Sequence, residues 1–387
     1  MPGLLSALSR RRAFLRRASL AAGAVALALL APAPAISLAG EVIPVLGEAA
    51  PDLIPPVSLE PPRLTYLTET ATGAPKVWIA AANGSGAKLL GPGQQPLLAP
   101  NGQAVAVALF GTVNGPQEHG PAIGIYPSSG ATIADYLSLE AATATPLAWS
   151  PDSRYLAVYA QSNGTVGIAA ASSLDVIDTQ TGTVATIAHG AIYGASFARD
   201  GSDRLVYALA HSLLASAKSN LYVAEADGAG VHPITSDGRS LLPIWGPTYI
   251  AYGRERARRL SPEYQIWLGT PTDPRVRKLT HVRVGALVQG LAPLAFSADG
   301  ARLLAELEGE DTSEAYAVDV GSGRARALHV GRQEVQGAGI SSDGSTLLLD
   351  ADSFEQAPSH GRIVTVPWAG GSPTLLVAHG AQASWND

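Results

Sequence analysis

The stretch PLAWSPDSRYLAVYA, residues 146–160, decides the fold class of this chain. Two short apolar runs, rich in β-branched and aromatic residues, flank a polar turn, and such runs are typical of strands. In several related copies the turn contains Asp-Gly or Asn-Gly, which supply the positive φ angles that a tight hairpin needs. The phrase therefore predicts an antiparallel β-hairpin.

The same phrase recurs along the chain, so the hairpin is one unit of a repeat. Its turns follow one another at steps of 44 to 52 residues, which suits the four-stranded blade of a β-propeller. Clear copies are ASFARDGSDRLVYA (195–208), PLAFSADGARLLAEL (293–307) and GISSDGSTLLLDA (339–351); degenerate copies are PLLAPNGQAVAVAL (96–109) and PIWGPTYIAYG (243–253). A second hairpin pattern, such as LDVIDTQTGTVATIA (174–188), fills the other half of each period and predicts the two outer strands.

These phrases resemble the repeats of TolB and of the tricorn-protease propellers, which are sometimes called WD40-like. The resemblance covers residues 63–387 and implies an all-β propeller domain. The chain departs from TolB at residues 36–62, a Pro-rich linker too short to encode the small α/β domain that precedes the propeller in that protein. The resemblance therefore predicts the fold of the repeats and does not predict that the chain has the same function as TolB.

The ends of the repeat region predict how the ring closes. The C-terminal ASWN, residues 383–386, resembles the first strand of a blade, but no second strand follows it. The segment from residue 63 onward has three strands of a blade and no first strand. Joining them would remove two exposed sheet edges. Six full periods and this shared blade predict a seven-bladed β-propeller closed by the C-terminal strand. The period around Trp245 has Pro247 in its turn and no Asp-Gly, so a six-bladed propeller stays as the alternative.

Residues 1–35 resemble a bacterial twin-arginine signal peptide. Paired arginines, Phe-Leu and a further arginine, RRAFLR at 11–16, precede an apolar stretch at 18–31. Two groups of small residues follow as alternative cleavage sites, Ala33-Pro34-Ala35 and Ser37-Leu38-Ala39. The apolar stretch is shorter than the roughly 20 residues of a spanning helix. We expect cleavage, no stable membrane span afterwards, and an extracytoplasmic location, in the periplasm, the cell envelope or the medium.

Composition limits the classes of partner. Apolar residues make up 47% and charged residues 15% of the chain, with 41 Gly, 28 Pro and no Cys, a profile typical of many short strands and incompatible with disulfides. The net charge is −6, and the segment 1–35 carries five arginines and no acid, so the rest is more acidic still. Nucleic acid is not expected as a partner, because phosphate binding needs a basic face.

The loops between second and third strands differ most from period to period and predict the binding face. Two of these loops are strongly charged and belong to adjacent blades. They contain Arg254, Arg256, Arg258 and Arg259 in one, and Glu306, Glu308, Glu310 and Asp311 in the other. Two interpretations stay open: solvated loops with mutual ion pairs of little energy, or a polarised recognition surface. The tryptophans, Trp267 among them, are interpreted as core, and the histidines that close outer strands, such as His281, as blade-joining groups.

No catalytic residue, metal ligand or cofactor site is predicted. The sequence has no Gly-x-Ser-x-Gly elbow and no Walker or Rossmann loop. The leading hypothesis is a non-enzymatic, exported scaffold that binds a protein or an envelope component. The alternative is a hydrolase or lyase whose site is assembled in the central funnel, which fold class alone does not exclude. The sequence gives no indication of the oligomeric state.

Overall fold

The computed structural model describes residues 42–43, 62–69, 75–109, 123–130, 134–136, 141–162, 172–210, 218–256, 263–283, 288–309, 313–330, 335–351 and 361–386. All regular elements in these segments are β-strands. The expected signal peptide, residues 1–35, lies outside them, as does the expected linker except for residues 42–43 and 62. Within the described segments no helix is long and apolar enough to cross a membrane.

The phrase at residues 146–160 forms a hairpin, as predicted. Its strands are β9 (Ala141–Trp149) and β10 (Tyr155–Ser162), and the second hairpin pattern forms β11 (Ser172–Asp178) and β12 (Val184–His189). The four strands are antiparallel neighbours in the order β9-β10-β11-β12, and the short β1 (Val42–Ile43) pairs with the outer edge of β12. One sequence period thus makes one four-stranded sheet.

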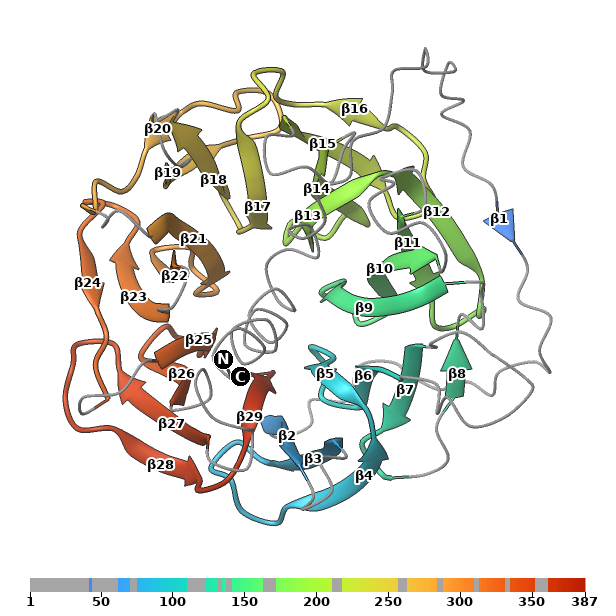
Figure 1. The fold of residues 1–387 in the computed structure, drawn as a ribbon, viewed down its shortest axis with the longest axis vertical. Helices are drawn as coiled ribbons and strands as arrows, with labels where there is room; N and C mark the ends of the chain where they lie inside the picture. The colour runs from blue at the N-terminus through green and yellow to red at the C-terminus, as the bar shows by residue number, and fades with distance from the viewer. Residues whose placement is uncertain are drawn as a thin grey trace, which may run out of the picture.

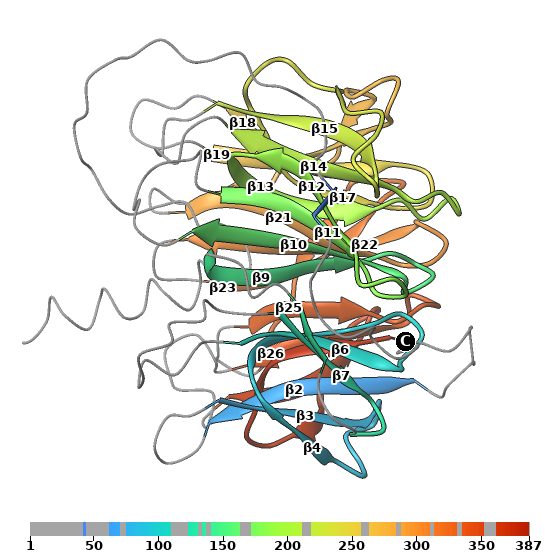
Figure 2. The same ribbon diagram turned by 90° about the vertical axis from the view of Figure 1, so that its right-hand side faces the viewer.

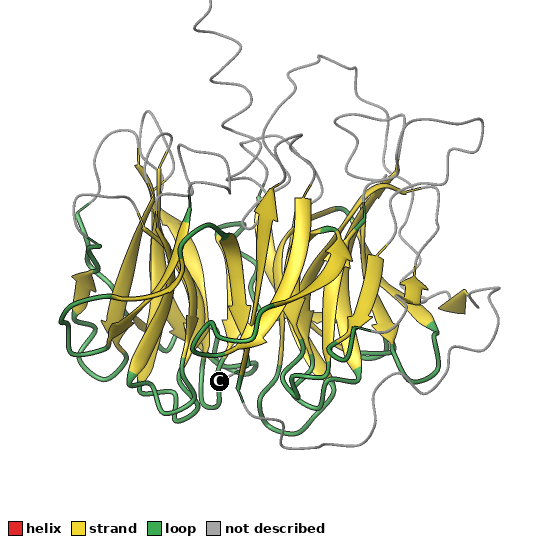
Figure 3. Ribbon diagram, turned by 90° about the horizontal axis from the view of Figure 1, so that it is seen from below, coloured by secondary structure: helices red, strands yellow, loops and turns green. Residues whose placement is uncertain are grey.

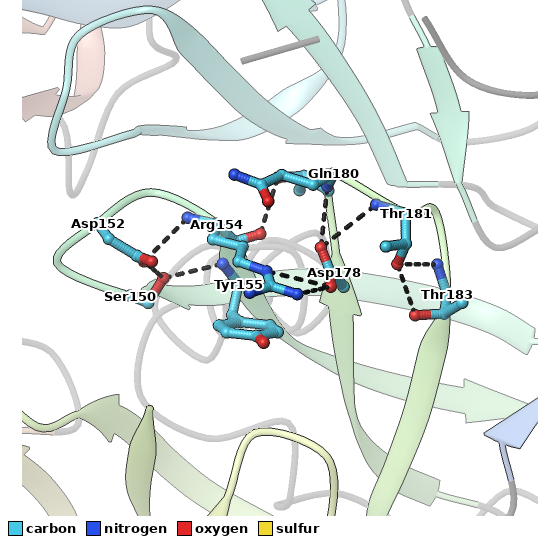
Figure 4. A network of polar contacts seen from close by, with 9 residues as sticks. Ser150, Asp152, Arg154, Tyr155, Asp178, Gln180, Thr181 and Thr183 are labelled. Atoms are coloured by element: carbon cyan, nitrogen blue, oxygen red, sulfur yellow. Dashed lines mark hydrogen bonds and ion pairs between the residues drawn. The ribbon is translucent and has the colours of Figure 1, made fainter. Parts of the chain in front are cut away.

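A serine and an aspartate hold the turn between the first two strands of such a sheet. The Ser150 hydroxyl bonds to the Asp152 carboxylate and accepts the Tyr155 amide at 2.8 Å (Figure 4). Two other turns have the same pair of contacts: Ser297 bonds to Asp299 and accepts the Arg302 amide, and Ser341 bonds to Asp343 and accepts the Thr346 amide. The Ser-x-Asp part of the repeat therefore closes the turn with side-chain bonds to the backbone, as short polar side chains commonly do.

The other periods form equivalent groups of strands. The segment that follows the linker contributes β2 (Arg63–Glu69), β3 (Pro75–Ala81) and β4 (Lys88–Pro92), and the next contributes β5 (Gln94–Leu98), β6 (Ala104–Ala108), β7 (Ile123–Pro127) and β8 (Ala134–Tyr136). After β12 come β13 (Ala191–Phe197), β14 (Arg204–Ala210), β15 (Ser219–Glu225) and β16 (His232–Pro233). Each group pairs in chain order.

The C-terminal half continues the pattern as three antiparallel groups within one extended sheet. They comprise β17 (Ser240–Trp245), β18 (Ile250–Arg256), β19 (Glu263–Gly269) and β20 (Arg277–Lys278); β21 (Val288–Phe296), β22 (Arg302–Gly309), β23 (Ser313–Asp319) and β24 (Ala325–Ala327); and β25 (Val335–Ile340), β26 (Thr346–Ala351), β27 (Arg362–Pro367) and β28 (Thr374–Val377). Single parallel pairs, Tyr264 with Gly290 and Glu314 with Val335, join the groups. The region around Trp245 thus folds into a regular group although its turn lacks Asp-Gly.

The groups are arranged around a common axis, and the strands nearest the centre are β5, β9, β13, β17, β21, β25 and the last strand, β29 (Ala381–Trp385) (Figure 1). Their strands run side by side when the molecule is seen from the edge (Figure 2). Neighbouring sheets pack face to face through apolar residues; one such cluster joins Ala106 and Ile123 to Leu156 and Val158. The described turns gather on one side, the lower side in Figure 3. The opposite side therefore holds the strand ends that flank the second-to-third connections.

The two ends of the repeat region meet in one sheet. The last strand, β29 (Ala381–Trp385), pairs with β2 through Leu64–Trp385 and Thr65–Ser384, in the order β29-β2-β3-β4. The Asn386 side chain accepts the Arg63 amide at 2.7 Å. The C-terminal strand therefore occupies the first-strand position beside β2.

Candidate functional site

Four of the eight charged residues that were predicted on the binding face lie within the described part of the chain. Arg254 and Arg256 lie at the end of β18, next to the connection at 257–262, on the side away from the turns. Glu306 and Glu308 lie near the end of β22. Arg258, Arg259, Glu310 and Asp311 fall outside the described residues, so the predicted adjacency of a basic and an acidic edge stays a prediction for them.

Glu306 is buried, with 8% of its surface exposed, and does not lie in a loop. Its carboxylate accepts the Ser313 hydroxyl at 2.5 Å and the Gly337 amide at 3.3 Å, which ties β22 to β23 and to the neighbouring β25. Arg254 has another partner, Asp237, in the segment between β16 and β17. The two described side chains therefore contact different neighbours.

A cavity of about 210 Å³ opens where β18, β19 and the segment after β20 meet. It includes both described arginines of the predicted basic loop. We call it the basic cavity; its lining consists of Arg239, Arg254, Glu255, Arg256, Glu263, Gln265, Trp267, Lys278, His281 and Val282.

The register between β18 and β19 places these side chains together. Arg254 lies opposite Gln265, and Arg256 lies opposite Glu263. Paired residues on antiparallel strands share one face of the sheet, and so do residues two apart on one strand. Lys278 joins them because it pairs with Trp267. Alternation along three strands thus concentrates cations on one face.

Arg254 is the fixed member of the group. Its Nη2 lies 2.8 Å and its Nε 2.9 Å from Asp237 Oδ2. The guanidinium carbon lies 4.8 Å from the centre of the Trp267 ring, a cation–π arrangement. Both contacts hold the guanidinium plane in one orientation, so Arg254 forms a wall of the cavity.

The buried part of the cavity is polar. Glu263 and Gln265 are 8% and 6% exposed. The Gln265 amide group donates to the Val282 carbonyl at 2.8 Å and accepts the Val282 amide at 3.0 Å and the Thr280 hydroxyl at 3.1 Å. These bonds fix the orientation of Gln265 and connect β19 to the segment after β20.

Positive charge exceeds negative charge in the basic cavity. Four permanent cations face two carboxylates, although the whole chain has a net charge of −6. Burial raises the pKa of Glu255, and the nearby Arg239 offsets part of that effect. Arg239 and Arg256 are exposed and Lys278 is half-buried. Within the described part of the chain none of these three forms an ion pair, so they can contact a ligand.

Of the cavity's lining, only Arg254 and Arg256 were predicted to lie on the binding face. Trp267, predicted as core, is partly buried and packs against a core cluster, and it also lines the cavity. His281, predicted as a blade-joining group, is exposed and belongs to the lining. Arg239, Lys278 and Gln265 were not singled out. Their contribution depends on the pairing of β18, β19 and β20, which the spacing of charges within one loop does not reveal.

The described residues contain no group of three or more His, Asp or Glu side chains placed to hold a metal ion. Another hollow, lined by Asp319, Arg324, Arg326 and Trp368, lies over the outer strands of the β21–β24 group. There Arg326 bonds to the Trp368 carbonyl. This contact joins two neighbouring groups of strands, so the hollow is primarily a packing seam.

The fold defines the class of this protein: a β-propeller. Among solved structures, the propeller domain of the Trilobed protease from Pyrococcus furiosus is 14% identical, with a TM-score of 0.57, covering 84% of this chain and 95% of that one. A solved structure from work on two prolyl endopeptidases is 12% identical to this chain with a TM-score of 0.57, and the match covers 97% of this chain. This chain spans about half, 52%, of that enzyme's length.

TolB from Acinetobacter baumannii also matches, at 16% identity and a TM-score of 0.48, covering 84% of this chain and 83% of TolB. The comparison with protein-family models gives no match, and neither does the comparison with curated proteins. At identities of 12% and 14%, the two matches with a TM-score of 0.57 establish the propeller fold alone, and the function has to be argued from the site.

Proposed function

We propose that this chain is an exported, non-enzymatic propeller that acts as a scaffold binding a protein or a cell-envelope component. The observation that carries the proposal is the basic cavity. Arg254 and Arg256 of its lining lie near the end of β18 that is away from the described turns, and the cavity presents three cations that form no ion pair within the described residues. A surface of this kind attracts an acidic partner.

The proposed scaffold has seven blades and is closed by its C-terminal strand. Three observations support this count. Each period forms a group of four strands, the period around Trp245 included, and β29 completes the group of β2, β3 and β4. Side chains also join β29 to its neighbours: Asp350 accepts the Ala383 amide at 3.2 Å, and Ser384 accepts the Leu98 amide at 3.2 Å.

The proposed location is extracytoplasmic. It rests on the sequence of residues 1–35, which resembles a twin-arginine signal, and on the Pro-rich residues 36–62 that separate this segment from the propeller. A twin-arginine signal directs a folded protein to export. Replacing Arg11 and Arg12 by Lys and following the distribution of the protein between cytoplasm and periplasm tests this part of the proposal.

Affinity capture from the cell envelope, compared between matched variants, tests the scaffold function. The bait pair is the wild-type protein and Arg256→Gln; the control is Arg275→Gln, an exposed arginine of the same group of strands near the turn side. We expect a partner that is recovered with the wild type and the control and depleted with Arg256→Gln. If no partner is recovered and the protein turns over a glycan or peptide library, the scaffold hypothesis is wrong and the alternative, an enzyme with its site in the central funnel, takes its place.

A further inference from the structure

We propose that the basic cavity binds one carboxylate, carried by an acidic side chain of a protein partner. This inference rests on the proposed scaffold function and specifies the chemical group that the scaffold recognises. Three properties of the cavity support it: its size, its balance of charges and the arrangement of Arg254, Arg256 and Trp267.

Size favours a single group over a whole small molecule. Pockets for drug-sized ligands usually span roughly 300–1,000 Å³, whereas the basic cavity measures about 210 Å³. A cavity below that range accommodates one side chain that projects from a larger partner. Arg256 is exposed and is the last residue of β18, so the rest of a partner can spread over the neighbouring strand ends.

The charge balance favours a carboxylate over a phosphate. A phosphomonoester carries about −1.5 to −2 charges at neutral pH, and it would enter a cavity that already contains Glu255 and Glu263. A carboxylate carries a single charge. Three cations of the cavity form no ion pair within the described residues, and two glutamates lie beside them. The excess of positive over negative charge is therefore matched by a ligand with one negative charge. Repulsion from the two glutamates thus selects against the more highly charged anion.

The geometry suits a glutamate or aspartate side chain. Arginine presents a planar fork of N–H donors that matches the two oxygens of a carboxylate. Arg256 and Lys278 lie toward opposite ends of the same strand face, one across from Glu263 and the other across from Trp267. Trp267 and Val282 offer apolar contact for the methylene groups of the ligand. Arg254 is already held by Asp237, so it shapes the site, while Arg256 binds the carboxylate and Arg239 and Lys278 add positive charge to the cavity.

Binding can be measured by NMR on the purified protein with ¹⁵N-labelled arginine. The probe is N-acetyl-glutamate N-methylamide, and its neutral glutamine counterpart is the control ligand. We expect saturable shifts of the Arg254 and Arg256 side-chain Nε–Hε signals with the glutamate probe only. Arg256→Gln should weaken this binding roughly fivefold or more, because a hydrogen-bonded charge contact is lost. Arg275→Gln should leave it unchanged.

Two results would overturn the inference: no shift of these signals with the glutamate probe, or binding of inorganic phosphate as tight as that of the glutamate probe. The scaffold function fails separately. If a captured partner survives Arg256→Gln, the cavity is not its docking point and the carboxylate inference is wrong while the scaffold stands. If the probe binds but no partner is captured, the cavity binds carboxylates and the scaffold proposal falls.

Discussion

At the residue scale, Asp343 shows how hydrogen bonds to one carboxylate stabilise the repeated turn. The carboxylate accepts the Ser345 amide at 2.8 Å and the Ser341 hydroxyl at 2.7 Å. These bonds, the backbone amide first, lower the pKa of Asp343 from 3.8 to about 2. Because the folded state binds the proton less readily than the unfolded state, the charged form stabilises the fold above about pH 4. That stabilisation is lost as the pH falls toward 2.

We therefore predict that Asp343→Asn lowers the free energy of unfolding slightly at pH 5 to 7 and that the difference from wild type vanishes near pH 2. Asparagine keeps an acceptor oxygen and removes only the charge; Asn101 performs this role naturally in the turn before β6, where it accepts the Gln103 amide at 2.9 Å. Urea unfolding at a series of pH values measures the effect. A difference that does not change with pH would show that the charge of Asp343 contributes nothing.

At the scale of the element, one aspartate joins two turns of the β9–β12 sheet. Asp178 accepts the Gln180 amide at 2.9 Å and the Arg154 guanidinium at 2.7 Å (Figure 4). Burial by itself would raise the pKa of Asp178, but the bonds from Arg154 and from backbone amides lower it. The carboxylate is nearly buried, at 10% exposure, whereas the Arg154 side chain is 36% exposed.

This asymmetry predicts unequal mutational costs. Asp178→Ala should lower the free energy of unfolding by about 1–3 kcal/mol, because it leaves backbone donors without their acceptor. Arg154→Ala should cost less than about 1 kcal/mol, as solvent screens its half of the pair. Equilibrium urea unfolding of both variants measures the order. Equal losses would mean that the ion pair, and not the turn amides, carries the energy.

The hairpin elements were predictable from sequence because their pattern is local. Apolar alternation and Ser-x-Asp turns lie within about 15 residues, so the strands around residues 146–160 could be read without knowing the rest. Even the irregular period at 243–253 forms strands: the Gly246 amide bonds to the Tyr249 carbonyl at 2.8 Å and closes its turn without Asp-Gly. The apolar flanks were sufficient there.

The bulges of the innermost strands were not predictable. Every pairing of a first with a second strand contains a register shift, which bends and twists the strand. At three of them a non-glycine residue has a left-handed φ: Gln95 at 53°, Leu242 at 51° and Gln382 at 53°. Neither residue type prefers this conformation, so the surrounding sheets impose it.

The candidate site was predictable only in part for the same reason. Arg254 and Arg256 stand out within one charged segment, but Arg239, Lys278 and Gln265 come from other strands. Their convergence depends on the register of β18, β19 and β20. Glu306 shows the opposite case, because a residue that reads as part of an acidic loop is buried between two sheets. Charge in a sequence therefore locates a site only where strand limits are also known.

At the scale of the whole molecule, the last strand, β29, pairs with β2 at the other end of the repeat region. Ala381 and Ala383 of β29 are 3% and 0% exposed. The Gln95 amide donates to the Gln382 side-chain carbonyl at 2.9 Å, which adds a contact with β5 to the one with β2. Gly339 leaves room for Trp385: a methyl group there would lie 2.4 Å from the indole nitrogen. The strand is thus inserted between the first and last repeats.

Deleting residues 383–387 should consequently destabilise the entire propeller and not merely fray its end. The loss of buried packing at Ala383 and Trp385 should cost at least about 3 kcal/mol and lower Tm by roughly 5–10 °C. Removal of residues 386–387 alone is the matched control and should have a smaller effect, since it keeps the strand and loses only the Asn386 bonds. A synthetic peptide covering residues 379–387, added to the truncated protein, should restore part of the lost Tm by pairing with β2. If the longer truncation melts like the wild type, β29 is not the strand that closes the ring, and the seven-bladed arrangement has to be replaced by one in which the N-terminal strands are held without it.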